Sequence, residues 1–237
     1  MSSKAKPALY LLPGLMCDAA VWQRQREALQ DEFDVRIPLF RGFDSLAAMA
    51  ESVLRDAPPR FSVAGHSMGG RVAFELVHRA GKRIERFAVL DTGAHPVKPD
   101  EPAKRQLLLD AARRKGLQAV ADAWILPMLH PDNHGNMALV AEITAMILRN
   151  SLQDYEGQVR ALLGRGDQRL YLPEIAQRTW LLCGEADSWS PVSQHEAMAA
   201  LIPRAELRVV PGGGHMCTME RPKAVTNLLR EWLHADA

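Results

Sequence analysis

Short apolar runs alternate with amphipathic stretches along most of this chain, and this alternation limits the available folds more than any other feature. A short apolar run indicates a buried strand, and apolar residues at helical spacing indicate a helix packed on one face. Repeated strand–helix units predict an α/β fold, with a mostly parallel sheet and helices on both faces. The predicted strands lie at residues 8–12, 33–37, 61–65, 87–90, 180–183 and 207–210.

The stretch at residues 98–164 departs from this alternation. It contains apolar residues at helical spacing but no convincing strand. We therefore expect an all-helical insertion between two strands of the sheet. The chain then divides into a first core part at 1–97, a helical lid at 98–164 and a second core part at 165–237.

The composition argues against several classes of protein. The 237 residues carry a net charge of +1, too little to attract nucleic acid or an anionic membrane as a partner. No apolar run approaches the roughly 18 residues that a membrane-spanning helix needs. The three cysteines are far apart with no CxxC spacing. We therefore expect a cytoplasmic protein with no metal and no cofactor, and the sequence leaves a homodimer open.

The segment at residues 61–70 contains the motif G-x-S-x-G, formed by Gly65, Ser67 and Gly69, between a predicted strand and a predicted helix. A sharp strand-to-helix turn of this kind holds the serine in a strained conformation with its hydroxyl projecting outward. Side chains two positions before and after the serine would collide, so glycine occupies both positions. The motif predicts that Ser67 is a nucleophile.

A serine hydroxyl is a weak nucleophile near neutral pH and needs an adjacent base. His215 is the best placed histidine, because it follows the last predicted strand and the flexible glycines at 212–214. Asp187 follows the strand at 180–183 and reaches the same sheet edge, where ligands bind in open parallel sheets. We predict that His215 is the general base and that Asp187 orients it, with Asp91 as the alternative acid.

Attack on a carbonyl group creates an oxyanion, which needs preorganised hydrogen-bond donors. The backbone N–H of Met68 directly follows the nucleophile, and the loop at 12–16 follows the first predicted strand. We expect the N–H groups of Met68 and Leu15 to form the oxyanion hole.

Taken together, these residues resemble the α/β-hydrolase superfamily. The resemblance covers nearly the whole chain and rests on the segments at 12–15, 65–70, 184–187 and 214–215. It implies the fold, the helical lid, the Ser-Asp-His triad and the oxyanion hole. Within the superfamily, the chain looks most like small esterases and carbon–carbon bond hydrolases. A serine nucleophile argues against the dehalogenase and epoxide hydrolase branches, which use aspartate.

Apolar side chains are concentrated in the predicted lid and near the loop at 12–16. Because ligand pockets are mostly apolar, we expect substrate contacts from Met16, Trp124, Met128 and Leu129. No arginine or lysine stands where the sequence predicts contact with a substrate carboxylate.

The expected reaction is hydrolysis of carboxylic esters of small to medium apolar substrates, with water and an ester-like small molecule as reaction partners. It would proceed through an acyl-enzyme on Ser67. A similar triad can also cleave a carbon–carbon bond or transfer an acyl group, and a non-catalytic small-molecule receptor can retain it. The sequence leaves these alternatives open, because a fold does not determine a substrate.

Overall fold

The computed structural model describes residues 5–235. Six strands form one sheet in the order β2-β1-β3-β4-β5-β6, and every neighbouring pair is parallel. This arrangement confirms the predicted α/β-hydrolase fold. The strands are β1 (Ala8–Leu12), β2 (Asp34–Arg36), β3 (Phe61–His66), β4 (Ile84–Leu90), β5 (Thr179–Gly184) and β6 (Ala205–Val210).

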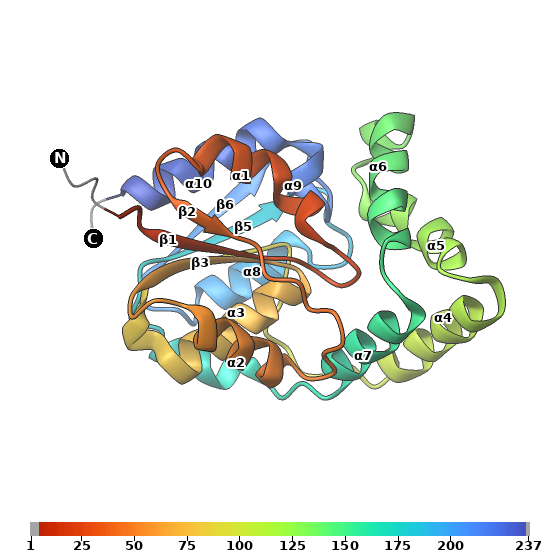
Figure 1. Cartoon of the computed structure of the whole chain (residues 1–237), viewed down its shortest axis with the longest axis horizontal. Coiled ribbons are helices and arrows are strands. Elements are labelled where there is room, and N and C mark those ends of the chain that lie inside the picture. The colour runs from red at the N-terminus through yellow and green to blue at the C-terminus, as the bar shows by residue number, and fades with distance from the viewer. Residues whose placement is uncertain (1–4, 236–237) are drawn as a thin grey trace.

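Helices cover both faces of the sheet (Figure 1). One face packs against α1 (Gln23–Leu29), α9 (Cys217–Glu220) and α10 (Pro222–His234), and the other against α2 (Leu46–Asp56), α3 (Met68–Ala80) and α8 (Val192–Ala199). In β1, Leu9 and Leu11 join the first apolar core while Tyr10 and Leu12 join the second. Alternate side chains of a strand point to opposite faces, so a sheet covered on both faces needs apolar residues throughout.

A run of four helices connects β4 to β5: α4 (Glu101–Lys115), α5 (Gln118–Met128), α6 (Met137–Leu148) and α7 (Leu152–Leu163). No strand occurs between residues 98 and 164, all of which the structure describes. These helices lie together beyond one end of the sheet, at the right in Figure 1. Short 3-10 helices complete the elements: η1 (Ala19–Trp22), η2 (Gly81–Arg83), η3 (Pro131–Asn133) and η4 (Gln168–Glu174).

Polar contacts fasten this four-helix segment to the loop after β1. The Gln158 side chain accepts a hydrogen bond from the Met16 N–H (2.8 Å), and the Asn150 side chain donates to the Met16 carbonyl (2.9 Å). Arg149 forms an ion pair with Asp18, with 2.6 Å between Nε and Oδ2. The segment therefore sits over the carboxyl ends of the strands, the edge at which open α/β sheets bind ligands.

The two outer strands of the sheet carry charged residues. β2 has three residues, of which Asp34 and Arg36 form an ion pair (2.6 Å). On β6, Glu206 pairs with Arg208 (2.8 Å). Among the described helices, none is both long enough and apolar enough to cross a membrane.

Candidate active site

Ser67 occupies the turn between β3 and α3, with φ 53° and ψ −116°. A side chain at Gly65 would place its Cβ 2.3 Å from the Gly69 carbonyl oxygen, and a side chain at Gly69 would place its Cβ 2.2 Å from the Leu12 carbonyl oxygen. The Ser67 N–H donates to the Leu90 carbonyl (2.9 Å), which ties the turn to β4. Close backbone packing thus requires both glycines and holds the serine in a conformation that non-glycine residues rarely adopt.

His215 lies between Ser67 and Asp187. Its Nε2 atom is 2.9 Å from Ser67 Oγ, and its Nδ1 atom is 2.9 Å from Asp187 Oδ2. The other Asp187 oxygen accepts the backbone N–H groups of Trp189 (2.8 Å) and Ser190 (2.9 Å). With its proton on Nδ1 facing the carboxylate, the imidazole presents an unprotonated Nε2 to the serine hydroxyl, as a general base must.

The interactions that Asp187 makes with His215 and with backbone donors favour the ionised form of its carboxyl group. Burial acts to raise its pKa, but the imidazole of His215 and the backbone donors outweigh burial and hold the pKa well below its usual range. Burial acts to lower the pKa of His215, and the charge and hydrogen bond of Asp187 outweigh it and raise that pKa. The carboxylate therefore stabilises the imidazolium that forms when the ring accepts a proton.

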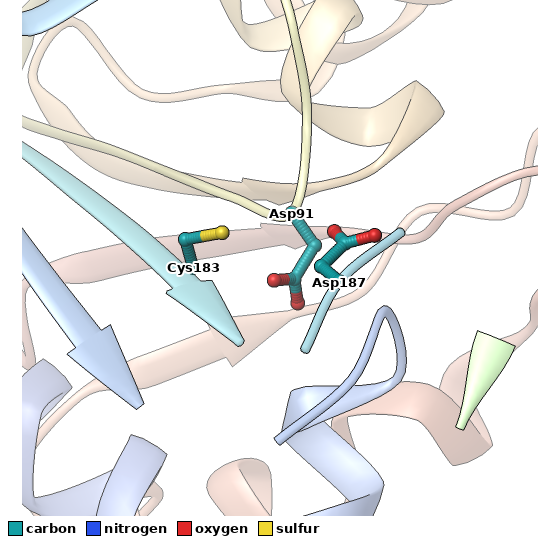
Figure 2. A group of neighbouring side chains, drawn as sticks. All are labelled: Asp91, Cys183 and Asp187. Atoms are coloured by element: carbon teal, nitrogen blue, oxygen red, sulfur yellow. The ribbon is translucent and has the colours of Figure 1, made fainter. Parts of the chain in front are cut away.

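Asp91, the alternative acid, follows β4 and lies beside Asp187 but does not occupy the same position (Figure 2). Its Oδ1 accepts the Gly184 N–H (2.8 Å), and no hydrogen bond joins it to His215 within residues 5–235. Burial, followed by the nearby charge of Asp187, raises the pKa of Asp91 well above its usual range. Burial and the charge of Asp187 therefore favour the neutral form of Asp91.

The side chain of Cys183 lies near the carboxyl groups of Asp91 and Asp187 (Figure 2). The potential metal-ligand atoms of these three residues lie within 4.8 Å of one another. Metal ligands must be deprotonated. Burial raises the pKa of the Cys183 thiol, as it does that of Asp91, and Asp187 is engaged by His215. The donor set of this group does not fit a metal ion.

The backbone N–H groups of Leu15 and Met68 are free to bind an anion, since neither donates to a protein acceptor in the described part of the chain. Both residues line the cavity above Ser67. A Cβ atom at Gly14 would lie 3.2 Å from the Cβ atom of Ser67, so the loop after β1 approaches the serine closely. Met68 also begins α3, where unpaired N–H groups favour negative charge.

A cavity of about 500 Å³ opens above Ser67 and His215. The helices between β4 and β5 supply most of its apolar wall, through Trp124, Met128, Ile143, Met146, Ile147 and Leu162. The ring of Trp189 lies 5.2 Å from that of His215 and 5.6 Å from that of Trp124, so an aromatic wall connects the helices to His215.

Of the four predicted substrate contacts, Trp124 and Met128 line this cavity, whereas Met16 and Leu129 do not. Met16 has φ 58° and is fully buried in the core. Leu129 is buried just past the end of α5, where the chain has left the helix. The sequence indicated an apolar cluster but not the rotation of each residue relative to the cavity.

The expectation that no arginine or lysine could contact a substrate carboxylate is wrong. Arg71, Arg105 and Arg165 all line the cavity. Arg71 lies near the start of α3, four residues after Ser67, so the sequence places it near the serine without showing which way its side chain points. Arg105 lies on α4 and Arg165 follows the helical segment, and their positions in the sequence do not reveal that both line the cavity.

A parallel α/β sheet with a strained serine at a strand-to-helix turn, beside a histidine–aspartate pair, is the arrangement typical of hydrolases of this fold. The family model described as "Alpha/beta hydrolase family" matches residues 9–228. The chain belongs to the alpha/beta hydrolase family and is an enzyme of the hydrolase class.

Three known proteins illustrate this membership. A solved thermophilic esterase from Thermogutta terrifontis superposes with a TM-score of 0.88 at 28% identity, covering 98% of this chain and 90% of that one. A pimeloyl-(acyl-carrier protein) methyl ester esterase from Nitrosomonas europaea is 25% identical over 92% of each chain. The biotin biosynthesis bifunctional protein BioHC of Cellvibrio japonicus is 22% identical over 96% of this chain, which spans 47% of that protein's length.

Proposed function

We propose that this enzyme hydrolyses carboxylic esters of small to medium apolar substrates, with Ser67 as nucleophile, His215 as general base and Asp187 as the orienting acid. The observation that carries the proposal is the hydrogen-bonded series from Ser67 Oγ through His215 to Asp187 below a largely apolar cavity. The esterase names of the Thermogutta and Nitrosomonas relatives support ester cleavage.

The reaction proceeds in two halves. His215 takes the hydroxyl proton as Ser67 Oγ attacks the ester carbonyl, and the N–H groups of Leu15 and Met68 bind the oxyanion. The imidazolium then gives its proton to the departing alcohol, which leaves an acyl group on Ser67. Water, deprotonated by His215, attacks this acyl-enzyme and releases the carboxylic acid with the free serine.

The helical segment at residues 98–164 serves as a lid between the core parts at 1–97 and 165–237. Trp124, Met128 and the α6 residues of the cavity wall support this role, because they enclose the substrate side of Ser67. Enclosure removes water from the reacting carbonyl and strengthens the hydrogen bonds that stabilise the oxyanion.

The test is turnover of p-nitrophenyl acetate, butyrate and octanoate by the wild type and by Ser67→Ala, together with covalent labelling by a fluorophosphonate. We expect Ser67→Ala to lose at least about 10³-fold in kcat/KM and all labelling. Ser52→Ala is the matched control, because within residues 5–235 the Ser52 hydroxyl donates only to the Met49 carbonyl of its own helix. Equal turnover by the wild type and Ser67→Ala would contradict the proposal.

A further inference from the structure

Arg71 is a buried cation on the wall of the cavity that contains Ser67. The residue is 7% exposed, and within residues 5–235 no carboxylate lies within ion-pair distance of its guanidinium group. Burial lowers its pKa to about 9, so the group still carries a positive charge at neutral pH. A buried charge without an opposite charge is costly, so such a group on a cavity wall is a candidate for binding an anionic ligand.

The neighbouring acid does not neutralise Arg71. Glu101 binds Arg165 through both of its oxygens, at 2.8 Å and 2.5 Å, and also contacts Arg105 at 2.7 Å. One carboxylate thus lies among three guanidinium groups, which leaves these four groups with a net charge of two positive, and Lys98 also lines the cavity. Lys104 at the rim adds little to this charge, because it pairs with Asp100 (2.6 Å).

Hydrogen bonds to His95 hold the Arg71 guanidinium group in place. Nη1 donates to the His95 carbonyl (3.0 Å) and Nη2 donates to the His95 ring at Nε2 (3.2 Å). The ring in turn donates from Nδ1 to the Pro96 carbonyl (2.8 Å), and burial lowers the pKa of His95 to about 4. His95 is therefore a neutral acceptor that orients the cation and does not repel it.

Arg71 also stands close to the reacting serine. The Arg71 N–H donates to the Ser67 carbonyl (3.3 Å), so one helical turn, about 5.4 Å along the axis, separates the two residues. Both residues line the cavity. A group held by Arg71 would thus be joined to the scissile carbonyl by a short chain.

We propose that the enzyme acts on esters that carry a carboxylate a short carbon chain away from the scissile bond, and that Arg71 binds this carboxylate. The planar guanidinium group of arginine matches the two oxygens of a carboxylate. Two of the five N–H donors of Arg71 bind His95, which leaves three donors for a ligand. The apolar wall then contacts the carbon chain.

The proposal rests on ester hydrolysis at Ser67 and deepens it, so the experiment separates the two. The substrates are monoethyl succinate and monoethyl adipate, each compared with its neutral amide, ethyl succinamate and ethyl adipamate. An amide has nearly the shape of a carboxylate without its charge. We expect the wild type to prefer at least one of the two half-esters over its amide by about tenfold or more in kcat/KM.

Arg71→Gln removes the charge and keeps a polar side chain. We expect it to lower kcat/KM for the preferred half-ester by about 10- to 100-fold and to change that of the amide by less than about threefold. Arg79→Gln is the matched control, because it removes the same charge from the same helix at an exposed ion pair outside the cavity. Fluorophosphonate labelling of Ser67 verifies that each variant has an assembled site.

If Arg71 merely braced α3 against His95, Arg71→Gln would weaken turnover of the half-ester and the amide alike, which would overturn the proposal. Inhibition of the wild type needs no variant and gives a second test. Adipate should inhibit p-nitrophenyl acetate hydrolysis competitively, at least about tenfold more tightly than adipamide, and equal inhibition would also overturn the proposal. A wild type that neither cleaves p-nitrophenyl acetate nor is labelled would instead contradict ester hydrolysis itself.

Discussion

The Nε2 atom of His215 lies 2.9 Å from the Oγ atom of Ser67, although the two residues are 148 positions apart in the chain. The sheet produces this proximity. Ser67 follows β3, Asp187 follows β5 and His215 follows β6, and all three strands run in the same direction. Loops from the carboxyl ends of parallel strands meet at one edge, so the contact is a consequence of topology and not of a local motif.

The pH dependence of activity should reflect the ionisation of His215. Only the neutral imidazole can accept the Ser67 proton, so kcat/KM should fall as pH drops below the pKa of His215. Asp187 raises that pKa above the ordinary value of 6.5, which places the acidic limb above pH 6.5. In Asp187→Asn the limb should move to lower pH, and kcat should fall on the order of 10⁴-fold. An acidic limb that stays in place in this variant would contradict the pairing.

Asp91→Asn distinguishes the two buried acids. The raised pKa of Asp91 favours its neutral form, whose charge an amide reproduces, and asparagine tolerates the positive φ of 47° found at this position. We expect kcat/KM within about tenfold of the wild type, in contrast to the roughly 10⁴-fold loss for Asp187→Asn. Steady-state kinetics of the two variants side by side provide the measurement, and similar large losses would assign the orienting role to both acids.

Gly69→Ala should disrupt the turn at Ser67. The added Cβ atom would meet the Leu12 carbonyl at 2.2 Å, so the backbone must shift, at a cost of about 1–3 kcal/mol in the free energy of unfolding. Activity should fall as well, since the same turn positions Ser67. Gly166→Ala is the control: no heavy atom lies within 4 Å of its added Cβ, and its stability should change by less than about 0.5 kcal/mol. Urea unfolding and esterase assays of both variants test this.

Glu101→Gln should destabilise the fold. The side chain of Arg165 is 1% exposed and depends on Glu101 for its opposite charge. Removing one partner of a buried ion pair leaves an uncompensated charge, which costs on the order of 3 kcal/mol. The exposed pair between Arg113 and Glu156 provides the control, because Glu156→Gln should cost less than about 1 kcal/mol. Equal midpoints of urea unfolding for the two variants would disagree with this account.

Much of the fold could be predicted from the sequence, because local patterns determine strands, helices and turns. The apolar runs identified the strands, and the glycines around Ser67 identified the turn that joins β3 to α3. Asp187 and His215 could be predicted as site residues because each follows a predicted strand. The loops after parallel strands meet at one edge of the sheet. These inferences required no knowledge of how helices rotate or tilt.

The cavity could not be predicted in the same way. Its wall depends on how α4 to α7 pack over the sheet, and that packing turns Ile143 and Met146 inward while it leaves Met16 and Leu129 in the core. The charge of the cavity was missed for the same reason. Arg71 and Arg165 look like ordinary surface cations in the sequence until the helical segment covers them.

The charged outer strands affect how copies of this chain can associate. An exposed strand offers unpaired backbone groups to a neighbour, and charged side chains along it discourage such pairing. A second molecule that extended the sheet past β2 or β6 would have to strip water from the ion pairs of Asp34 with Arg36 or of Glu206 with Arg208. The charged residues on both outer strands therefore disfavour intermolecular β-pairing and fibril growth.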